Sequence, residues 1–239
     1  MFITDQVNSF GLEKGVREFL KERKIKHEQL YAFSDVPENC PWYEHKDKAP
    51  SQAVKDIFEP VEDMLPETVS LLAKHCKAIL CMYENETWYL LYVVKMWGSD
   101  YYLWVGRQPA DSPHLNPEAL DAGWQIPEAL REFYMVHEGF GESDLVYGEI
   151  TDQRMWHANC IRPASRLEPS AWEIEGEDGA NYHPGQLLFF FHDGSEDYFG
   201  FLPDKENAAY YNQAEGYIED SLAGDMFGLI DEYFSEMFL

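Results

Sequence analysis

Three short runs rich in Tyr, Trp, Val and Leu follow one another along the chain, and they limit the fold more than any other feature. The runs cover residues 78–83, 87–95 and 100–107. The segments between them, residues 84–86 and 97–99, contain Asn, Gly and Ser, which favour turns. Strands joined by such short turns pair with their neighbours and run antiparallel. The sequence therefore predicts a three-stranded antiparallel meander.

Helical spacing of apolar residues precedes this meander. Residues 9–26 place apolar side chains on one helical face and basic side chains on the other. Residues 30–50, which contain Pro, Asp and Lys, are expected to form a loop. Residues 51–77 are expected to be helical with interruptions at Pro60 and Pro66, because proline cannot donate the backbone hydrogen bond that a helix interior needs.

A group of prolines after the meander is the best candidate for a linker. Pro109, Pro113 and Pro117 lie within nine residues of one another. We therefore predict an N-terminal α+β region over residues 1–110, with helices followed by the meander, and a second domain over residues 111–239. The sequence leaves open whether the first region is an independent domain or an extension of one sheet.

The second part alternates helical and strand patterns. Residues 117–138 are expected to be helical, with an interruption near Pro127. Further strands are expected at residues 145–150, 155–160 and 171–175, a hairpin at 186–192 and 197–202, and short strands at 210 and 217–218. An amphipathic helix from about residue 222 closes the chain. Together the patterns predict an α+β fold, with a mixed or antiparallel sheet flanked by helices.

Negative charge is concentrated near the end of the chain. The formal net charge is −26, and residues 168–239 contain 17 acidic residues against one basic residue, Lys205. A field of this sign repels nucleic acid and anionic lipid and attracts basic surfaces. Aromatic residues occur in the same segments, so the acids are expected to coat a folded domain. We expect a basic protein partner, with no nucleic acid and no membrane as partners.

Cysteine usage and hydropathy favour a cytoplasmic protein. No apolar run approaches the roughly 20 residues that cross a bilayer, and no secretory signal is visible at the first residues. The cysteines are scattered and lack the paired Cys/His spacing of zinc sites, which favours buried, reduced thiols. They are Cys40, Cys76, Cys81 and Cys160, with His75 and His157 near two of them.

Three segments of the second part carry motifs in a recognisable order. Residues 123–139 contain an Ile-Pro pair, a helical pattern and a closing Glu-Gly. Residues 188–198 contain an apolar strand, an acidic turn with Gly194 and a returning strand. Residues 222–239 form an amphipathic pattern that ends in Phe-Leu.

In this order the segments resemble the SUKH superfamily, the Smi/Knr-type domains of fungal cell-wall regulators and bacterial immunity proteins. The first is similar to the family's opening of Leu-Pro, a helix and Asn-Gly, with Ile126 for Leu and Glu138 for Asn. In the second, Glu196 stands where a Gly usually precedes the Asp, and the third resembles a Phe-x-x-Phe-Leu ending. The resemblance covers about residues 115–239 and leaves residues 1–110 unexplained. It implies an α+β domain without catalytic residues, which in bacteria often neutralises a secreted toxin domain.

Seven acidic residues on or near predicted strand ends form the candidate partner-binding site. If they cluster, their carboxylates would mimic phosphates toward a basic active site and steer its approach. The alternative is a solvated face that keeps the protein soluble. The seven are Glu173, Glu175, Glu177, Asp178, Asp193, Glu196 and Asp197.

A calcium loop is a weaker interpretation of the same region. Asp193, Ser195, Asp197 and Asp204 stand at positions 1, 3, 5 and 12 of an EF-hand-like loop, but Tyr198 occupies the position that requires Gly. A hairpin turn between two apolar strands explains these residues better. We expect no metal and no cofactor.

The patterns favour a protein that binds over one that catalyses. No nucleophile elbow and no H-E-x-x-H motif is found, and we expect no catalytic residues. Our first hypothesis is a cytoplasmic immunity protein that binds a toxin nuclease or nucleic-acid deaminase and blocks its active site. The alternatives are a constitutive scaffold or regulatory protein of the Smi/Knr type, and a hydrolase that uses paired carboxylates.

Overall fold

The computed structural model describes residues 6–23, 29–96, 100–110, 127–143, 160–166, 174–176, 179, 181–182, 188–192, 197–202, 208–212, 217–219 and 226–238. The strands are β1 (Gln29–Ala32), β2 (Cys76–Glu84), β3 (Thr87–Lys95), β4 (Tyr101–Arg107), β5 (Phe140–Glu142), β6 (Cys160–Arg166), β7 (Ile174–Gly176), β8 (Asn181–Tyr182), β9 (Leu188–His192), β10 (Asp197–Phe201), β11 (Ala208–Asn212) and β12 (Tyr217–Glu219). The helices are α1 (Lys14–Arg23), α2 (Pro50–Phe58), α3 (Pro66–His75), α5 (Glu128–Tyr134) and α7 (Met226–Glu236). Short 3-10 turns lie at η2 (Val7–Ser9), η3 (Phe33–Asp35), η4 (Tyr43–His45) and η5 (Glu59–Val61).

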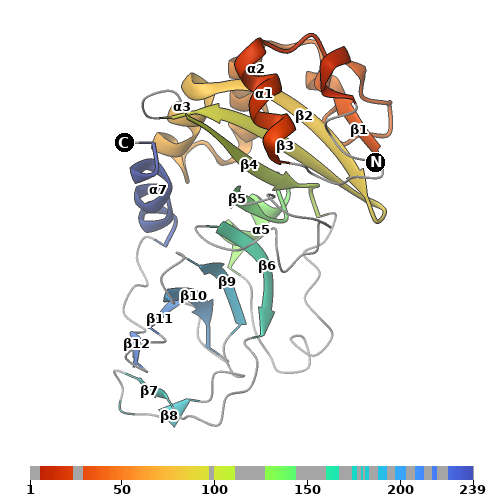
Figure 1. The fold of residues 1–239 in the computed structure, drawn as a ribbon. Helices are drawn as coiled ribbons and strands as arrows, with labels where there is room; N and C mark the ends of the chain where they lie inside the picture. The colour runs from red at the N-terminus through yellow and green to blue at the C-terminus, as the bar shows by residue number, and fades with distance from the viewer. Residues whose placement is uncertain are drawn as a thin grey trace.

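The described strands form one sheet flanked by helices, so the predicted α+β fold is confirmed (Figure 1). The strand order is β1-β2-β3-β4-β5-β6-β9-β10-β11-β12-β7-β8. Neighbouring strands are antiparallel except β12 and β7, which are parallel. Pairing between β4 and β5 carries the sheet across residue 110. The strands of the first 110 residues therefore extend the same sheet, while the division into two domains stays a prediction.

The predicted meander is confirmed in β2, β3 and β4. Glu84 pairs with Thr87, so two residues connect β2 to β3. Those residues, Asn85 and Glu86, have φ angles of 48° and 61°. Positive φ at both central positions belongs to the tight turn whose twist matches an antiparallel hairpin.

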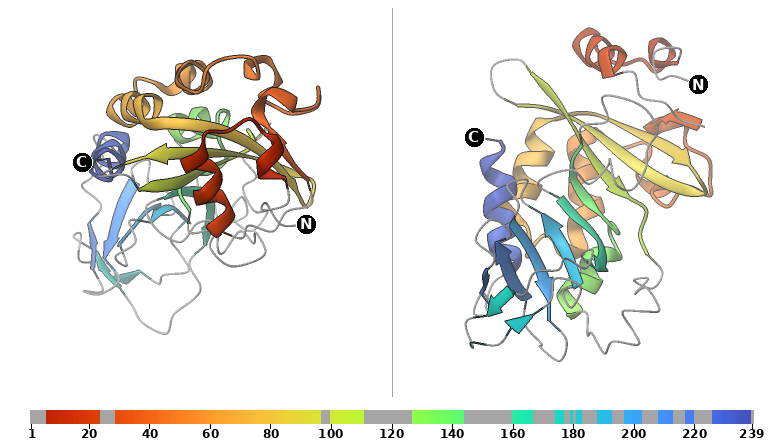
Figure 2. Two further views of the ribbon diagram at one scale, coloured as in Figure 1. Left: turned by 45° about the horizontal axis from the view of Figure 1, so that its top comes forward. Right: turned by 60° about the horizontal axis from the view of Figure 1, so that its bottom comes forward.

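Both faces of the meander are buried, which explains why its strands are apolar almost throughout. Along β3, Leu90, Tyr92 and Val94 belong to the core under α2, α3, α5 and α7. The alternate residues, such as Leu91 and Val93, belong to a second cluster under α1 and η2. Figure 2 shows α1 and the α2–α3 pair on opposite sides of the sheet.

The helical predictions in the first 110 residues are confirmed, and one loop prediction is wrong. In α1, Val16 and Leu20 are buried as their spacing predicts. Helix α2 ends at Phe58 before Pro60, and α3 begins at Pro66. The predicted loop over residues 30–50 contains strand β1 at its start. A strand of four residues is too short to show a clear alternating pattern in the sequence. It is stabilised by its antiparallel pairing with β2.

In the second part, the hairpin and the closing helix are confirmed. Strands β9 and β10 pair antiparallel, with a bulge next to Gly200. A Cβ atom on Gly200 would lie 2.9 Å from the carbonyl oxygen of Leu188, which explains the glycine. In α7, Phe227, Ile230 and Phe234 are buried, as predicted. Three predictions lie outside the described residues: the linker beyond residue 110, the first half of the helix at 117–138, and the strand at 145–150. Of the strand predicted at 155–160, only Cys160 is described, and it begins β6.

Helix α3 receives its N-terminal cap from the other end of the chain. Its N-cap residue, Leu65, has no side chain that caps the helix. Instead, the Asp231 carboxylate of α7 accepts hydrogen bonds from the backbone N–H of Glu67 at 3.0 Å and of Thr68 at 2.8 Å. Two amides that helix geometry leaves unpaired are thus satisfied in a buried setting. This contact fixes α7 against α3.

We predict that Asp231→Ala lowers the free energy of unfolding by about 2 kcal/mol, because it removes the cap and leaves buried amides without acceptors. Urea denaturation measures the change. Glu232→Ala is the matched control, since the neighbouring side chain is exposed. An equal loss in both variants would contradict the capping role.

Candidate functional site

Most of the predicted partner-binding acids lie outside the described residues. These are Glu173, Glu177, Asp178, Asp193 and Glu196. Glu175 lies in β7 and Asp197 begins β10, and the structure describes the backbone of both.

The two described positions share one row across the sheet. Asp197 pairs with Asn212 of β11, and Asn212 pairs with Tyr217 of β12. Tyr217 in turn pairs with Glu175. At roughly 4.8 Å per strand, three strand intervals place the two acidic positions about 14 Å apart. Residues 193–196, which include Asp193 and Glu196, directly precede Asp197 in the sequence and lie outside the described residues. The clustering of the seven acids therefore stays a prediction.

The metal interpretations find no support in the described part of the chain. No group of three or more His, Cys, Asp or Glu side chains within it is arranged to hold a metal ion. His75 directs Nδ1 to the carbonyl oxygen of Lys95 at 3.0 Å, and the Cys76 thiol donates to Ala78 at 3.4 Å. For the calcium interpretation, strands β9 and β10 pair antiparallel, as the hairpin alternative predicts, while Asp193, Ser195 and Asp204 lie outside the described residues.

A pocket of about 570 Å³ opens where η4, α2 and the end of α5 meet. Its lining contains both apolar and charged side chains. Its apolar lining consists of Pro41, Trp42, Ile57, Pro60, Pro109, Met135 and Val136. Its polar lining consists of Glu44, His45, Lys48, Asp56 and Glu59. A concave site that combines apolar side chains with convergent polar groups is a candidate binding site.

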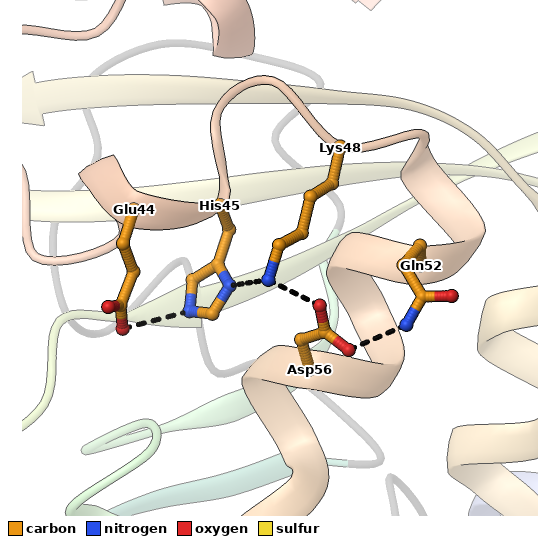
Figure 3. Close-up of polar contacts among 5 residues, drawn as sticks. All are labelled: Glu44, His45, Lys48, Gln52 and Asp56. Atoms are coloured by element: carbon orange, nitrogen blue, oxygen red, sulfur yellow. Dashed lines mark hydrogen bonds and ion pairs between the residues drawn. The ribbon is translucent and has the colours of Figure 1, made fainter.

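A chain of polar contacts joins five side chains, four of which line this pocket (Figure 3). The Lys48 ammonium lies 3.2 Å from His45 Nδ1 and donates to Asp56 Oδ2. Gln52 Nε2 donates to Asp56 Oδ1 at 2.6 Å, one helical turn away on α2. His45 Nε2 lies 3.3 Å from Glu44 Oε1.

The donors of Lys48 determine the tautomer of His45. An ammonium group has no acceptor, so Nδ1 of His45 must accept and its proton resides on Nε2, facing Glu44. Burial, then repulsion from Lys48, lowers the pKa of His45. The hydrogen bonds from Lys48 and Gln52 lower the pKa of Asp56. Both ring nitrogens of His45 thus have a partner within the network. This arrangement suits the binding of a charged or polar group better than the removal of a proton from a substrate by His45.

Beneath the pocket, a second histidine is fully enclosed. His137 Nδ1 donates to the carbonyl oxygen of Arg107 at 2.9 Å, and Nε2 accepts from the Tyr92 hydroxyl at 2.9 Å. The ring centroid of Trp42, a pocket residue, lies 5.4 Å away. A Cβ atom on Gly106 would lie 2.4 Å from the imidazole, so only glycine fits there. Burial lowers the pKa of His137 to about 4, which makes it a neutral structural residue at pH 7.

Sequence reasoning assigned the segment with His45 to a loop and did not single out the pocket. A local signal was present, because Lys48, Gln52 and Asp56 recur at the spacing of one helical turn. The apolar lining could not be predicted from the sequence, because Pro109 and Met135 are far from His45 along the chain.

No family model, no curated protein and no solved structure matches this chain. None of the helices in the described ranges has the length and apolar character to span a bilayer.

We predict that Lys48→Met raises the pKa of His45, because the repulsion and the donor to Nδ1 disappear together. The value should stay below that of a solvated histidine, since burial is the larger cause. NMR titration of the imidazole Cε1–H resonance measures it. Lys46→Met is the control, because Lys46 pairs with Asp47; an equal shift there would refute the direct contact.

We also predict a stability loss on acidification that depends on His137. The unfolded chain takes up a proton near pH 6.5, whereas the folded chain resists until about pH 4. The contribution of neutral His137 to the free energy of unfolding is therefore complete above pH 6.5. It decreases by about 3 kcal/mol as the pH falls from 6.5 to 4. Urea denaturation between pH 7 and 4 measures this. His137→Gln should be less stable at pH 7 and show a shallower pH slope in this window.

Proposed function

We propose that this chain is a non-enzymatic, cytoplasmic binding protein of the SUKH type. In this proposal it acts as an immunity protein, binds a toxin nuclease or nucleic-acid deaminase, and blocks the active site. The observation that carries the proposal is the acidic excess in residues 168–239, with 17 acidic residues and one basic residue. The motif resemblance over the same part of the chain adds to it.

The electrostatic argument concerns enzymes that act on nucleic acids. Such enzymes present basic surfaces to a phosphate backbone. A surface dense in carboxylates competes for those surfaces and accelerates encounter by long-range attraction. The exposed side of α7 belongs to this acidic part and carries Glu232 and Glu236.

The geometry of the described pocket favours binding over hydrolysis. Paired-carboxylate hydrolysis needs one carboxyl group that stays protonated near neutral pH. The pKa of Asp56 moves the other way, because Lys48 and Gln52 donate to its ionised form. The imidazole of His45 has both nitrogens occupied. These contacts support the assignment as a binding protein.

We predict a complex with the toxin domain encoded beside this gene, whose association rate constant falls about tenfold or more between 50 and 500 mM salt. Stopped-flow mixing or surface plasmon resonance measures the rate. Co-expression should restore growth to cells that carry the toxin domain. If co-expression with each neighbouring toxin domain produces neither rescue nor a complex, the proposal is wrong. Stable partners in cells without any toxin gene would favour the scaffold hypothesis instead.

A charge-reversal pair locates the contact. Glu232→Lys with Glu236→Lys should slow association by about 3- to 10-fold, because two exposed acids of the acidic part change sign. Glu62→Lys with Asp63→Lys makes the same change in net charge on exposed residues of the N-terminal region. Equal effects from both pairs would show that total charge, and not the acidic part, drives association.

A further inference from the structure

Two buried thiols from distant parts of the chain touch each other. The Sγ atoms of Cys40 and Cys81 lie 3.9 Å apart, although 41 positions separate the residues. Cys40 is 3% exposed and Cys81 is 0% exposed. A disulfide bond of about 2.05 Å would need an approach of roughly 2 Å.

The two cysteines differ in how firmly the backbone holds them. Cys81 lies in the middle of β2, paired with Tyr31 of β1 on one side and Leu90 of β3 on the other. Cys40 lies in the turn between η3 and η4, where its N–H donates to Pro37 at 2.9 Å. A surface turn moves more readily than a strand paired on both sides. We therefore expect Cys40, rather than Cys81, to move when the two sulfur atoms approach each other.

We propose that Cys40 and Cys81 form a site of covalent modification, an oxidisable dithiol that hydrogen peroxide converts to a disulfide within the folded protein. Cys40 directly precedes Pro41 and Trp42, which line the pocket. The disulfide would tie this wall of the pocket to the central sheet.

The reaction consumes one peroxide and proceeds in two steps. The Cys40 thiolate attacks one peroxide oxygen, the O–O bond breaks, and hydroxide leaves and takes up the proton lost by the thiol, which yields a sulfenic acid and water. Cys81 sulfur then loses its proton and attacks Cys40 Sγ, the S–O bond breaks, and a second water leaves. Two thiols lose two electrons and two protons, and hydrogen peroxide is reduced to two waters.

The environment assigns the attacking role to Cys40. The side-chain hydrogen bond between Cys40 and Cys81 lowers the pKa of Cys40 against the effect of burial, and a backbone hydrogen bond with Trp42 lowers it further. Burial raises the pKa of Cys81, which suits it to retain its proton until the second step. Burial likewise raises the pKa of Cys76 to about 12. Cys160 packs in the cluster on the α1 side of the sheet, apart from the core that holds the pair.

The full-length protein is treated with a small molar excess of hydrogen peroxide under native conditions, quenched, and then unfolded for thiol titration with Ellman's reagent. We expect the four thiols of the reduced chain to fall to two, and peptide mapping to join Cys40 to Cys81. The melting temperature should rise by about 5–10 °C, because the cross-link restricts the unfolded chain. Dithiothreitol should reverse both changes.

The variants separate this pair from general thiol oxidation. The Cys76→Ala/Cys160→Ala variant should still form the bond, whereas Cys81→Ala should stop at a Cys40 sulfenic acid that dimedone labels. Four thiols remaining in folded wild-type protein, or a bond between Cys76 and Cys81, would overturn the inference. Peptide mapping of the wild-type protein tests the disulfide even if a variant fails to fold. The test also does not depend on whether the proposed partner exists.

Discussion

Burial of both faces of the β2–β4 meander is the constraint on which the rest of this structure depends. An antiparallel sheet with one solvent-exposed face packs against helices on its other face only. A strand such as β3 is apolar at consecutive positions, so both of its faces must be buried. Helix α1 covers one face, and α2, α3, α5 and α7 cover the other. Trp104 of β4 contacts Phe140, Phe234 and Phe238, so the same requirement draws the second part of the chain into the core.

The high negative charge is compatible with this core because the buried acids that the structure describes have partners. Asp231 accepts from two backbone amides of α3. Glu138 forms an ion pair with Arg107 at 3.3 Å. A buried charge without such partners would cost several kcal/mol. These two buried carboxylates stabilise the fold through specific contacts. Only the acidic side chains on the exposed surface are therefore accessible to a partner.

Local patterns made much of the fold predictable, whereas the contacts that join distant segments were not. The meander, the breaks at Pro60 and Pro66, and the β9–β10 hairpin depend on residues a few positions apart, so periodicity and turn chemistry reveal them. The cap that Asp231 places on α3 joins residues more than 160 positions apart. The sequence around Asp231 does not indicate that it contacts α3, and the sequence around α3 does not indicate Asp231. The contact between Cys40 and Cys81 and the apolar lining of the pocket likewise join distant segments without a local signal. Of the seven predicted acids, Glu175 and Asp197 lie in described strands, and their clustering as a surface stays a prediction.

Charge and shape contribute differently to recognition in such a molecule. At physiological salt, attraction between exposed charges is screened beyond about 8 Å, and within that range it does not distinguish one basic surface from another. Discrimination requires contacts at van der Waals distance, which come from apolar side chains held in a fixed frame. On the described surface, Met135 is the large apolar side chain with the greatest exposure, at 54%, and it lines the same pocket as Lys48 and Asp56. If the proposed partner also contacts this pocket, its apolar side chains would supply the short-range specificity that the acidic residues alone do not.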